Sequence, residues 1–294
     1  MQIEPRFHKI EKIGPVIIWK FHNPPQNLAT SETFIELIIL IEAFDKDPEL
    51  RVGIVTSAMP GMFIQHFDVS ELVVWGESLK EATAEDIDRV IADLPPKSMG
   101  DYTEKPIICA INGPVEGGGC EMALGCDFRF ISRDAFMGQP EVWSGFPPGS
   151  GGMQYLARLV GTERAMELCM TGRNITAEEA ERLGLVTAAC EPDDLMPRVM
   201  AFANDLAAKP PLAIANIKKA ITRGSSMPLQ EALVLERKLF LECLRSDDAM
   251  NFMRLYVAAG QDAEKMMAML EEAGQDPEKL AQLIAENGEM NNDG

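Results

Sequence analysis

The sequence is short of positive charge and of long apolar runs, and each shortage argues against a class of function. Its 27 Lys and Arg residues stand against 46 Asp and Glu residues, which gives a formal net charge of −19 at pH 7. Such an acidic surface repels phosphate backbones and anionic lipids, so we expect no nucleic-acid partner and no membrane binding. The most apolar segment, residues 35–44, contains Glu36 and Glu42 and falls short of the roughly 20 residues of a membrane-spanning helix.

Residues for metal and disulfide chemistry are also few. The chain has three histidines and six scattered cysteines, and none of them has zinc-ligand spacing. We therefore expect no metal site. The cysteines lie mostly in apolar stretches, which favours free thiols packed as small hydrophobic residues in a reducing cytoplasm. The first fourteen residues lack the apolar core of a signal peptide, so we expect a cytoplasmic protein.

The hydrophobic pattern predicts an α/β protein. Residues 16–21 are typical of a strand, and residues 52–56 are typical of a buried strand. Between them, apolar residues from Thr33 to Phe44 recur at helical spacing after Thr30 and Ser31, which are candidate helix N-caps. Strand, helix and strand in this order predict a parallel unit. Beyond Pro192 the pattern is helical throughout. Further strands are expected at 106–111, 127–131 and 185–190, and further helices at 68–75, 84–94, 120–124, 150–160, 162–171 and 176–183.

The first candidate site is the glycine triplet Gly117-Gly118-Gly119, which leads into Cys120 and Glu121. Glycines between a buried strand and a helix let the backbone pass close to a ligand. The helix start leaves unpaired amides and a partial positive charge, which suit a developing oxyanion. Taken alone, however, the triplet is better explained by close packing of the helix against the strand.

A second candidate is Glu141 in the segment Gly138-Gln139-Pro140-Glu141. It follows Glu121 after one expected strand and the loop that brings the chain back towards the same end of the sheet. Two glutamates that face one small cavity cannot both ionise freely, so their pKa values separate into an acid and a base. Such a pair can activate water and deliver a proton. Either glutamate alone would be explained as a solvated loop carboxylate.

These motifs together resemble the crotonase (enoyl-CoA hydratase/isomerase) superfamily. The resemblance rests on IICAINGPVEGGGCEMALGCDFRFIS, AFMGQPEVWSGFPPGSGG and LVGTERAMELCMTGRNITAEEAERLGLV, and it covers about residues 10–250. It implies an α/β fold with a spiral core of repeated ββα units and a C-terminal all-helical region. We therefore predict a crotonase-like catalytic core at 1–195, a helical trimerisation region at 196–260, and an acidic, Met-rich helical extension with a disordered end at 261–294.

The resemblance also implies a function. Family members bind acyl-CoA thioesters and hold an enolate with two backbone amides. The predicted activity is that of a lyase of fatty acid metabolism, which adds water across the α,β double bond of an acyl-CoA or removes it. Coenzyme A would belong to the substrate, with no separate cofactor. The implied assembly is a homotrimer or homohexamer.

The site residues carried over from the family are two amides and two carboxyls. Phe67 and Gly118 would donate the oxyanion-hole hydrogen bonds, Glu121 would act as the base towards water, and Glu141 would protonate the α-carbon. The residues predicted to bind substrate are His66, Asp68, Gly117 and Gly149.

The sequence departs from the family at His66-Phe67-Asp68, where relatives usually carry small residues, and we expect these side chains to reshape the acyl pocket. Residues 23–29 and 68–70 lack the lysines that often flank the CoA phosphates in relatives. The remaining candidates are Lys218, Lys219 and Arg223, with Arg237 and Lys238 in a later helix. One alternative is therefore a crotonase-fold isomerase, lyase or CoA-free carbon–carbon bond hydrolase acting on another substrate, for example an aromatic one. Another is a non-catalytic assembly protein that retains the scaffold.

Overall fold

The central sheet forms from the apolar segments that the sequence pattern marks as strands. In a computed structural model that describes residues 4–93, 99–273, 279 and 282–286, six strands pair in the order β1-β2-β3-β4-β6-β9. Strand β1 is antiparallel to β2, and the other neighbours are parallel. The strands are β1 (His8–Ile13), β2 (Val16–Phe21), β3 (Val52–Ser57), β4 (Ile107–Ile111), β6 (Phe128–Ser132) and β9 (Ala188–Cys190).

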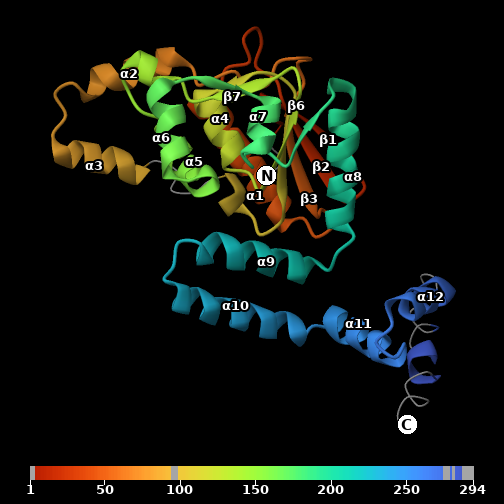
Figure 1. Cartoon of the computed structure of the whole chain (residues 1–294). Helices are drawn as coiled ribbons and strands as arrows, with labels where there is room; N and C mark the ends of the chain where they lie inside the picture. Colours follow the sequence, from red (N-terminus) through yellow and green to blue (C-terminus); the bar gives the residue numbers. More distant parts are fainter. Residues whose placement is uncertain (1–3, 94–98, 274–278, 280–281, 287–294) are drawn as a thin grey trace. The chain divides into compact units, whose positions relative to one another are not determined.

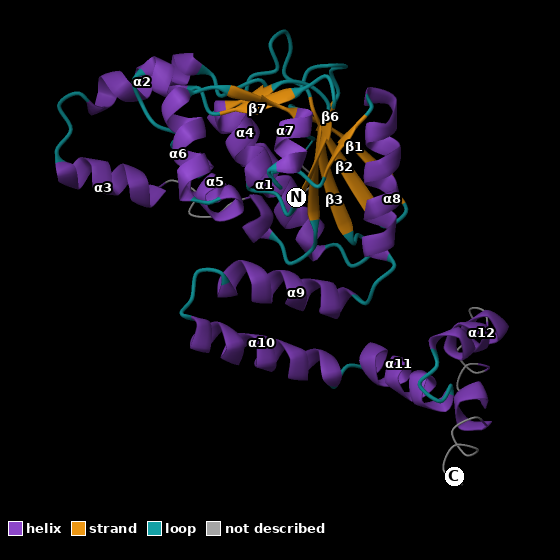
Figure 2. Cartoon of the chain, in the orientation of Figure 1, coloured by secondary structure: helices purple, strands orange, loops and turns teal. Residues whose placement is uncertain are grey.

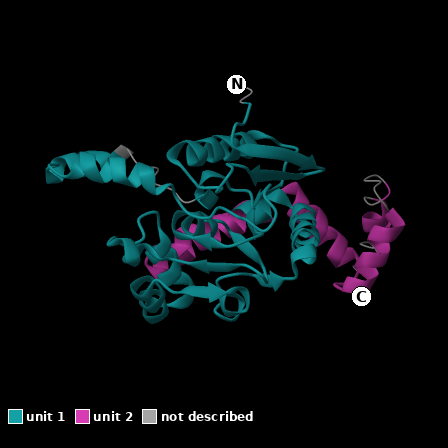
Figure 3. Cartoon of the chain, turned by 90° about the horizontal axis from the view of Figure 1, so that it is seen from above, with its two compact units in different colours: residues 1–215 teal, residues 216–294 magenta. Residues whose placement is uncertain are grey.

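The chain folds into two compact units, residues 1–215 and 216–294, which are described separately (Figure 3). The first unit holds both sheets and the helices that cover them (Figures 1 and 2). Its α-helices are α1 (Ser31–Lys46), α2 (Val69–Leu79), α3 (Ala84–Asp93), α4 (Gly117–Leu124), α5 (Gly152–Val160), α6 (Thr162–Thr171), α7 (Ala177–Arg182), α8 (Leu195–Ala207) and the first turn of α9 (Pro211–Gly224). Short 3₁₀ turns lie at Met99–Tyr102, Glu141–Ser144 and Pro192–Asp194.

Alternate side chains of the buried strands pack into two different hydrophobic cores. Trp19 and Phe21 of β2 pack in the cluster that also contains side chains of α1 and α4. Val16 and Ile18 of the same strand pack in a second cluster with side chains of α8. Because successive side chains of a strand point to opposite faces, the apolar run at β2 is buried on both sides, as parallel strands usually are.

Helix α1 begins where the sequence predicted a cap. The Thr30 hydroxyl accepts from the Thr33 amide at 3.2 Å, and the Thr33 hydroxyl accepts from the Thr30 amide at 2.8 Å, which forms a capping box. The fold class and most of the predicted elements are confirmed, including β2, β3, β4 and β6. The last predicted strand is shorter than expected and consists of Ala188–Cys190.

Helix α4 begins at Gly117, three residues earlier than the predicted start at Cys120. Glycine has a low helix propensity, so the sequence suggested a loop there. Packing decides otherwise, because a Cβ atom at Gly119 would overlap the carbonyl oxygen of Ile64. The triplet therefore forms the first turn of a helix that lies against the segment before Phe67.

A second, three-stranded sheet was not expected. It consists of β5 (Val115–Glu116), β7 (Phe136–Gly138) and β8 (Asn174–Thr176), in the order β5-β7-β8. Segments of two or three residues have too little periodicity to be recognised in a sequence. This small sheet carries the chain from β5 into α4, and from β7 into the segment that contains Glu141.

The second unit is helical and contains the rest of α9 with α10 (Leu229–Leu244), α11 (Asp247–Ala258) and α12 (Ala263–Ala273). Met266 and Met269 of α12 pack against Leu255 of α11, and Leu283 and Ile284 pack against the same cluster. The disordered end that the sequence predicts for the tail lies outside the described residues. The domain boundaries at 195 and 260 remain predictions. None of the helices that the structure describes is long and apolar enough to cross a bilayer.

Gly53 offers a test of the sheet packing. A Cβ atom there would overlap the ring of buried Trp19. We expect Gly53→Ala to lower the free energy of unfolding by about 1–3 kcal/mol through overpacking, measured by urea denaturation. Gly76→Ala is the matched control: nothing lies within 4 Å of a Cβ at this position in helix α2. It should leave stability unchanged or raise it by up to ~1 kcal/mol, and equal losses in both variants would contradict the packing argument.

Candidate active site

Glu121 is the fifth residue of helix α4 and is 4% exposed. Its Oε1 accepts hydrogen bonds from the amides of Ser150 at 2.7 Å and Gly152 at 2.9 Å. Burial raises the pKa of Glu121, while the two amide donors oppose this rise because they favour the charged form. Glu121 is thus a buried carboxylate with dedicated partners for its negative charge.

Glu141 starts the 3₁₀ turn after β7 and is 9% exposed. Burial, together with the negative charges of Glu121 and Glu116, raises the pKa of Glu141 to about 7. The thiols of Cys120 and Cys169 also face this pair, and burial raises the pKa of each, which keeps them neutral. The two glutamates therefore differ in environment, and that difference suits a base at Glu121 and an acid at Glu141.

The buried side chain of Gln139 lies between the two glutamates. With its amide nitrogen turned towards Glu141, it donates to both carboxyl oxygens at 3.1 and 2.9 Å. Turned by 180°, the amide oxygen would instead accept the proton of a neutral Glu141. On its other side Gln139 lies beside Gly152, which also contacts Glu121. Gln139 can therefore serve Glu141 in either protonation state.

Two backbone amides lie side by side next to the glutamates. Gly118 is the second residue of α4, where a helix amide has no partner within the helix, and Glu116 provides no side-chain cap. A Cβ atom at Gly118 would lie 2.9 Å from Phe67 Cβ and 3.6 Å from Phe67 N. A Cβ at Gly117 would lie 3.1 Å from Glu141 Oε1. The amides predicted for the oxyanion hole therefore adjoin the predicted acid.

The remaining predicted site residues divide into two groups. His66 lies beside Gly117, and its Nδ1 bonds to the Phe67 carbonyl oxygen at 2.8 Å. Asp68, in contrast, is the N-cap of α2 and accepts from the Ser70 amide at 2.9 Å. Hydrogen bonds from the side chain and from the amide of Ser70 lower the pKa of Asp68. Gly149 is exposed, and the amides on Glu121 come from the residues just after it.

A third carboxylate, Glu116, lies at the edge of the site. Glu116, Gly138 and Asn174 are partners across the small sheet, so they stand in one row. The amide of Asn174 reaches over Gly138 and donates to Glu116 Oε1 at 2.8 Å. A side chain at Gly138 would overlap the Asn174 amide oxygen, so the glycine leaves room for this bond. Asn174 thereby fixes a negative charge near Glu141.

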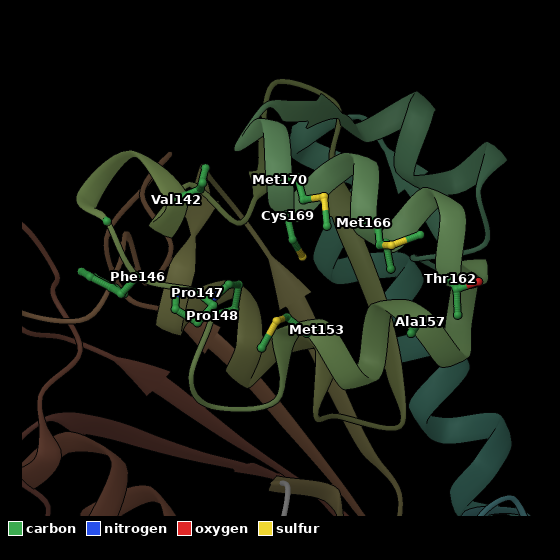
Figure 4. A pocket seen from close by; sticks show the side chains of 12 residues that line it. Val142, Phe146, Pro147, Pro148, Met153, Ala157, Thr162, Met166, Cys169 and Met170 are labelled. Atoms are coloured by element: carbon green, nitrogen blue, oxygen red, sulfur yellow. The ribbon is translucent and has the colours of Figure 1, made fainter.

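An apolar cavity of about 550 Å³ begins at Val142, the residue after Glu141 (Figure 4). It is lined by the loop that follows Glu141 and by helices α5 and α6, with Phe146, Met153 and Met166 among its walls. Cys169 also lines it, and the negative charges of both glutamates contribute to the raised pKa of its thiol. The cavity wall therefore lies within electrostatic reach of the reacting groups.

Comparison with known proteins identifies the family. The sequence profile of the enoyl-CoA hydratase/isomerase family matches residues 11–272. The chain belongs to this family. A short-chain-enoyl-CoA hydratase of Clostridium acetobutylicum is 36% identical over 251 residues, which are 84% of this chain and 93% of that protein. A crotonyl-CoA hydratase of Syntrophomonas wolfei is 33% identical over 253 residues, 85% of this chain and 93% of that protein.

Solved structures give the same answer. An enoyl-CoA hydratase subunit I of Geobacillus kaustophilus superposes with a TM-score of 0.77 at 31% identity, covering 87% of this chain and 96% of that one. An enoyl-CoA hydratase of Bacillus anthracis gives a TM-score of 0.74 at 26% identity, covering 85% and 96%. The resemblance read from the sequence is confirmed, and so is the enoyl-CoA hydratase/isomerase fold.

Several contacts of this enoyl-CoA hydratase/isomerase family member were not found from its sequence. Gln139 stands in a motif that was singled out, but no pattern shows that its amide faces Glu141. Ser150 and Gly152 lie next to Gly149, the residue expected to supply an amide. Glu116 and Asn174 are 58 positions apart, and only the pairing of β5, β7 and β8 brings them together.

The negative charge of Glu116 should affect how kcat/KM depends on pH. If Glu141 is the proton donor, kcat/KM for hydration falls as pH rises through its pKa of about 7. Glu116→Gln keeps an acceptor for Asn174 but removes one of the two negative charges that, together with burial, raise this pKa. We expect the fall to begin at lower pH, by on the order of half a unit. Glu163→Gln, an exposed change on α6, should leave the profile in place, and an unmoved profile in Glu116→Gln would refute the coupling.

Proposed function

We propose that this enzyme hydrates the double bond of short-chain 2-enoyl-CoA thioesters. The observation that carries the proposal is the contrast between two buried glutamates: Glu121 receives two amide hydrogen bonds, and Glu141 has its pKa raised to about 7. The names of the two curated relatives, a short-chain-enoyl-CoA hydratase and a crotonyl-CoA hydratase, support the short chain and the CoA carrier.

The proposed reaction uses each group once. Glu121 takes a proton from water as the water oxygen attacks the β-carbon of the substrate. The electrons of the double bond move onto the thioester carbonyl, and the amides of Phe67 and Gly118 stabilise the resulting enolate oxygen. Glu141 then gives its proton to the α-carbon, which completes the 3-hydroxyacyl-CoA. Dehydration follows the same steps in reverse.

The rate effects expected of these amides and carboxyls are large enough for catalysis. Loss of one oxyanion-hole donor typically costs about 10²–10³ in kcat. Proton transfer by a positioned carboxyl typically contributes about 10²–10⁴-fold. Oxyanion binding and proton transfer both require carboxyls and amides that are in position before the substrate binds. The hydrogen bonds on Glu121 and the proximity of Gly118 to Phe67 support such an arrangement.

The proposal also includes coenzyme A as the acyl carrier and the cytoplasm as the location of the enzyme. Coenzyme A enters as part of the substrate, and no further cofactor takes part in the steps above. The residues that the sequence offered for its phosphates, Lys218, Lys219 and Arg223, lie on α9 in the second unit. All six cysteines are free thiols, and four of them are buried, as expected in the reducing cytoplasm in which we place the enzyme.

Self-association is proposed on the basis of exposed apolar side chains around the cavity. Trp143 is 79% exposed and Met170 is 69% exposed, and Met166, Val142 and Phe146 are also exposed beside them. An apolar patch of this kind on a protein of otherwise acidic surface favours a covering partner. We infer that a second copy of the chain covers it, in the homotrimer or homohexamer that the family resemblance implies.

The catalytic proposal is tested with two substitutions that keep the shape of the side chain. Glu121→Gln and Glu141→Gln should each lower kcat for crotonyl-CoA hydration by about 10²–10⁴-fold, followed as loss of the enoyl-thioester absorbance. Glu36→Gln, a half-buried hydrogen-bonded glutamate on α1, is the matched control and should keep near wild-type kcat. Full activity in both active-site variants would remove these carboxyls from the mechanism.

The assembly proposal is tested by placing a charge in the apolar patch. We expect Met170→Glu on α6 to convert a wild-type trimer or hexamer into smaller species, because a buried unpaired carboxylate is costly. Light scattering coupled to size-exclusion chromatography measures the mass. Met267→Glu makes the same change at an exposed position of α12 and should leave the mass unchanged. A wild-type monomer would disprove the proposal.

A further inference from the structure

Phe67 combines an oxyanion-hole amide with a large aromatic side chain that has its own partners. Its ring centroid lies 6.0 Å from that of Phe34 on α1, at an interplanar angle of 38°. On the other side it lies 5.8 Å from the ring of Trp75 on α2, at 42°. The three rings, Phe34, Phe67 and Trp75, form an aromatic row that connects two helices through the residue whose amide is proposed to hold the enolate.

The peptide groups before and after Phe67 are both hydrogen-bonded to Ala29. The Ala29 amide donates to the His66 carbonyl oxygen at 2.9 Å, and the Asp68 amide donates to the Ala29 carbonyl oxygen at 2.7 Å. Phe67 and Ala29 therefore pair like residues of adjacent parallel strands. In such a pairing the amide of the middle residue points away from the partner strand. The Phe67 amide is thus left available, and the direction in which it points depends on how firmly its residue is held.

Helix α2, which follows Phe67, has little else to hold it. Over Val69–Leu79 no side chain of this described helix is buried. Its connections to α1 are the Trp75 ring, through Phe67, and Glu71, whose Oε2 accepts from the Ser31 amide at 3.2 Å and the Ser31 hydroxyl at 2.6 Å. A helix without buried side chains is positioned by such tethers. Trp75 is the apolar one among them.

We propose that Phe34 and Trp75 are positioning residues for the reaction, because they hold the Phe67 ring between α1 and α2 and so aim its amide at the enolate oxygen. Neither residue touches the reacting atoms. The inference rests on the proposed hydratase function, and it concerns the side chains that this sequence carries around its unusual oxyanion-loop phenylalanine.

The expected effect is selective for the transition state. The oxyanion charge is complete only in the enolate, so a misdirected amide weakens transition-state binding more than substrate binding. A displacement of about 1 Å can cost about 10²-fold in rate. A smaller side chain at Phe34 or Trp75 weakens the aromatic row but leaves the Phe67 amide in place. Such a change should lower kcat about 10-fold and change KM less than about twofold.

The test uses Phe34→Leu, Trp75→Leu and the conservative Trp75→Phe, assayed with crotonyl-CoA. We expect both leucine variants to show the kcat loss, and Trp75→Phe to retain at least half of wild-type kcat. The double leucine variant should lose little more than either single variant, since both act through the same ring. Equal losses in Trp75→Phe and Trp75→Leu, or fully additive losses, would overturn the proposal.

A matched control separates positioning from general destabilisation. Phe202 on α8 also lies between two rings, 4.9 Å from Phe128 and 5.4 Å from Phe130, but it packs in the cluster on the other face of the sheet. Phe202→Leu should lower the unfolding midpoint as much as Trp75→Leu does and leave kcat unchanged. An equal kcat loss in Phe202→Leu would mean that the effect of Trp75→Leu reflects stability alone.

A spectroscopic measurement reports the amide directly and does not depend on turnover. Butyryl-CoA labelled with ¹³C at the thioester carbonyl is bound to each variant, and the carbonyl stretch is read by infrared difference spectroscopy. We expect a shift to lower wavenumber on binding to the wild type, and a smaller shift in Trp75→Leu. An equal shift in both would overturn the proposal. A wild type that binds but does not hydrate crotonyl-CoA would instead refute the proposed function.

Discussion

The site depends on how closely the start of helix α4 approaches its neighbours. Each glycine of the triplet leaves room for a different neighbour, because it has no side chain. Gly119 leaves room for the carbonyl of Ile64, Gly118 for the side chain of Phe67, and Gly117 for the carboxyl of Glu141. A methyl group at Gly119 would separate the helix from the oxyanion segment, and the two amides would no longer lie side by side. The close packing that competed with oxyanion binding as an explanation of this triplet is therefore the same contact that the proposed oxyanion hole requires.

The two glutamates show how one fold can supply an acid and a base from identical side chains. Both are buried, and burial alone would raise the pKa of each. The difference comes from partners: amides face Glu121, whereas the negative charges of Glu121 and Glu116 face Glu141. The amides of Ser150 and Gly152 favour the charged form of Glu121, whereas the neighbouring negative charges favour the neutral form of Glu141.

How much the sequence could reveal depended on the range of the interactions involved. Apolar periodicity over 16–21 and 52–56, and the cap at Thr30, are local, and they predicted β2, β3 and α1. The glutamates could be paired because their motifs recur in a known order. The row Glu116–Gly138–Asn174 and the contact of Gln139 with Glu141 could not be found in this way, because they depend on the register of strands too short to show a pattern. Helix α4 was placed three residues late for a related reason, since packing overrode the low helix propensity of glycine.

Phe67 illustrates how a departure from a family pattern can leave the chemistry intact. A backbone amide donates in the same way whatever side chain its residue carries, provided that the side chain does not displace the backbone. Here the ring lies towards Phe34 and Trp75, so its bulk is accommodated between two helices. A small residue at this position could not make those contacts and would leave helix α2 held mainly by polar contacts such as that of Glu71 with Ser31. The packing of the larger side chain is therefore compatible with the proposed role of the Phe67 amide in the oxyanion hole.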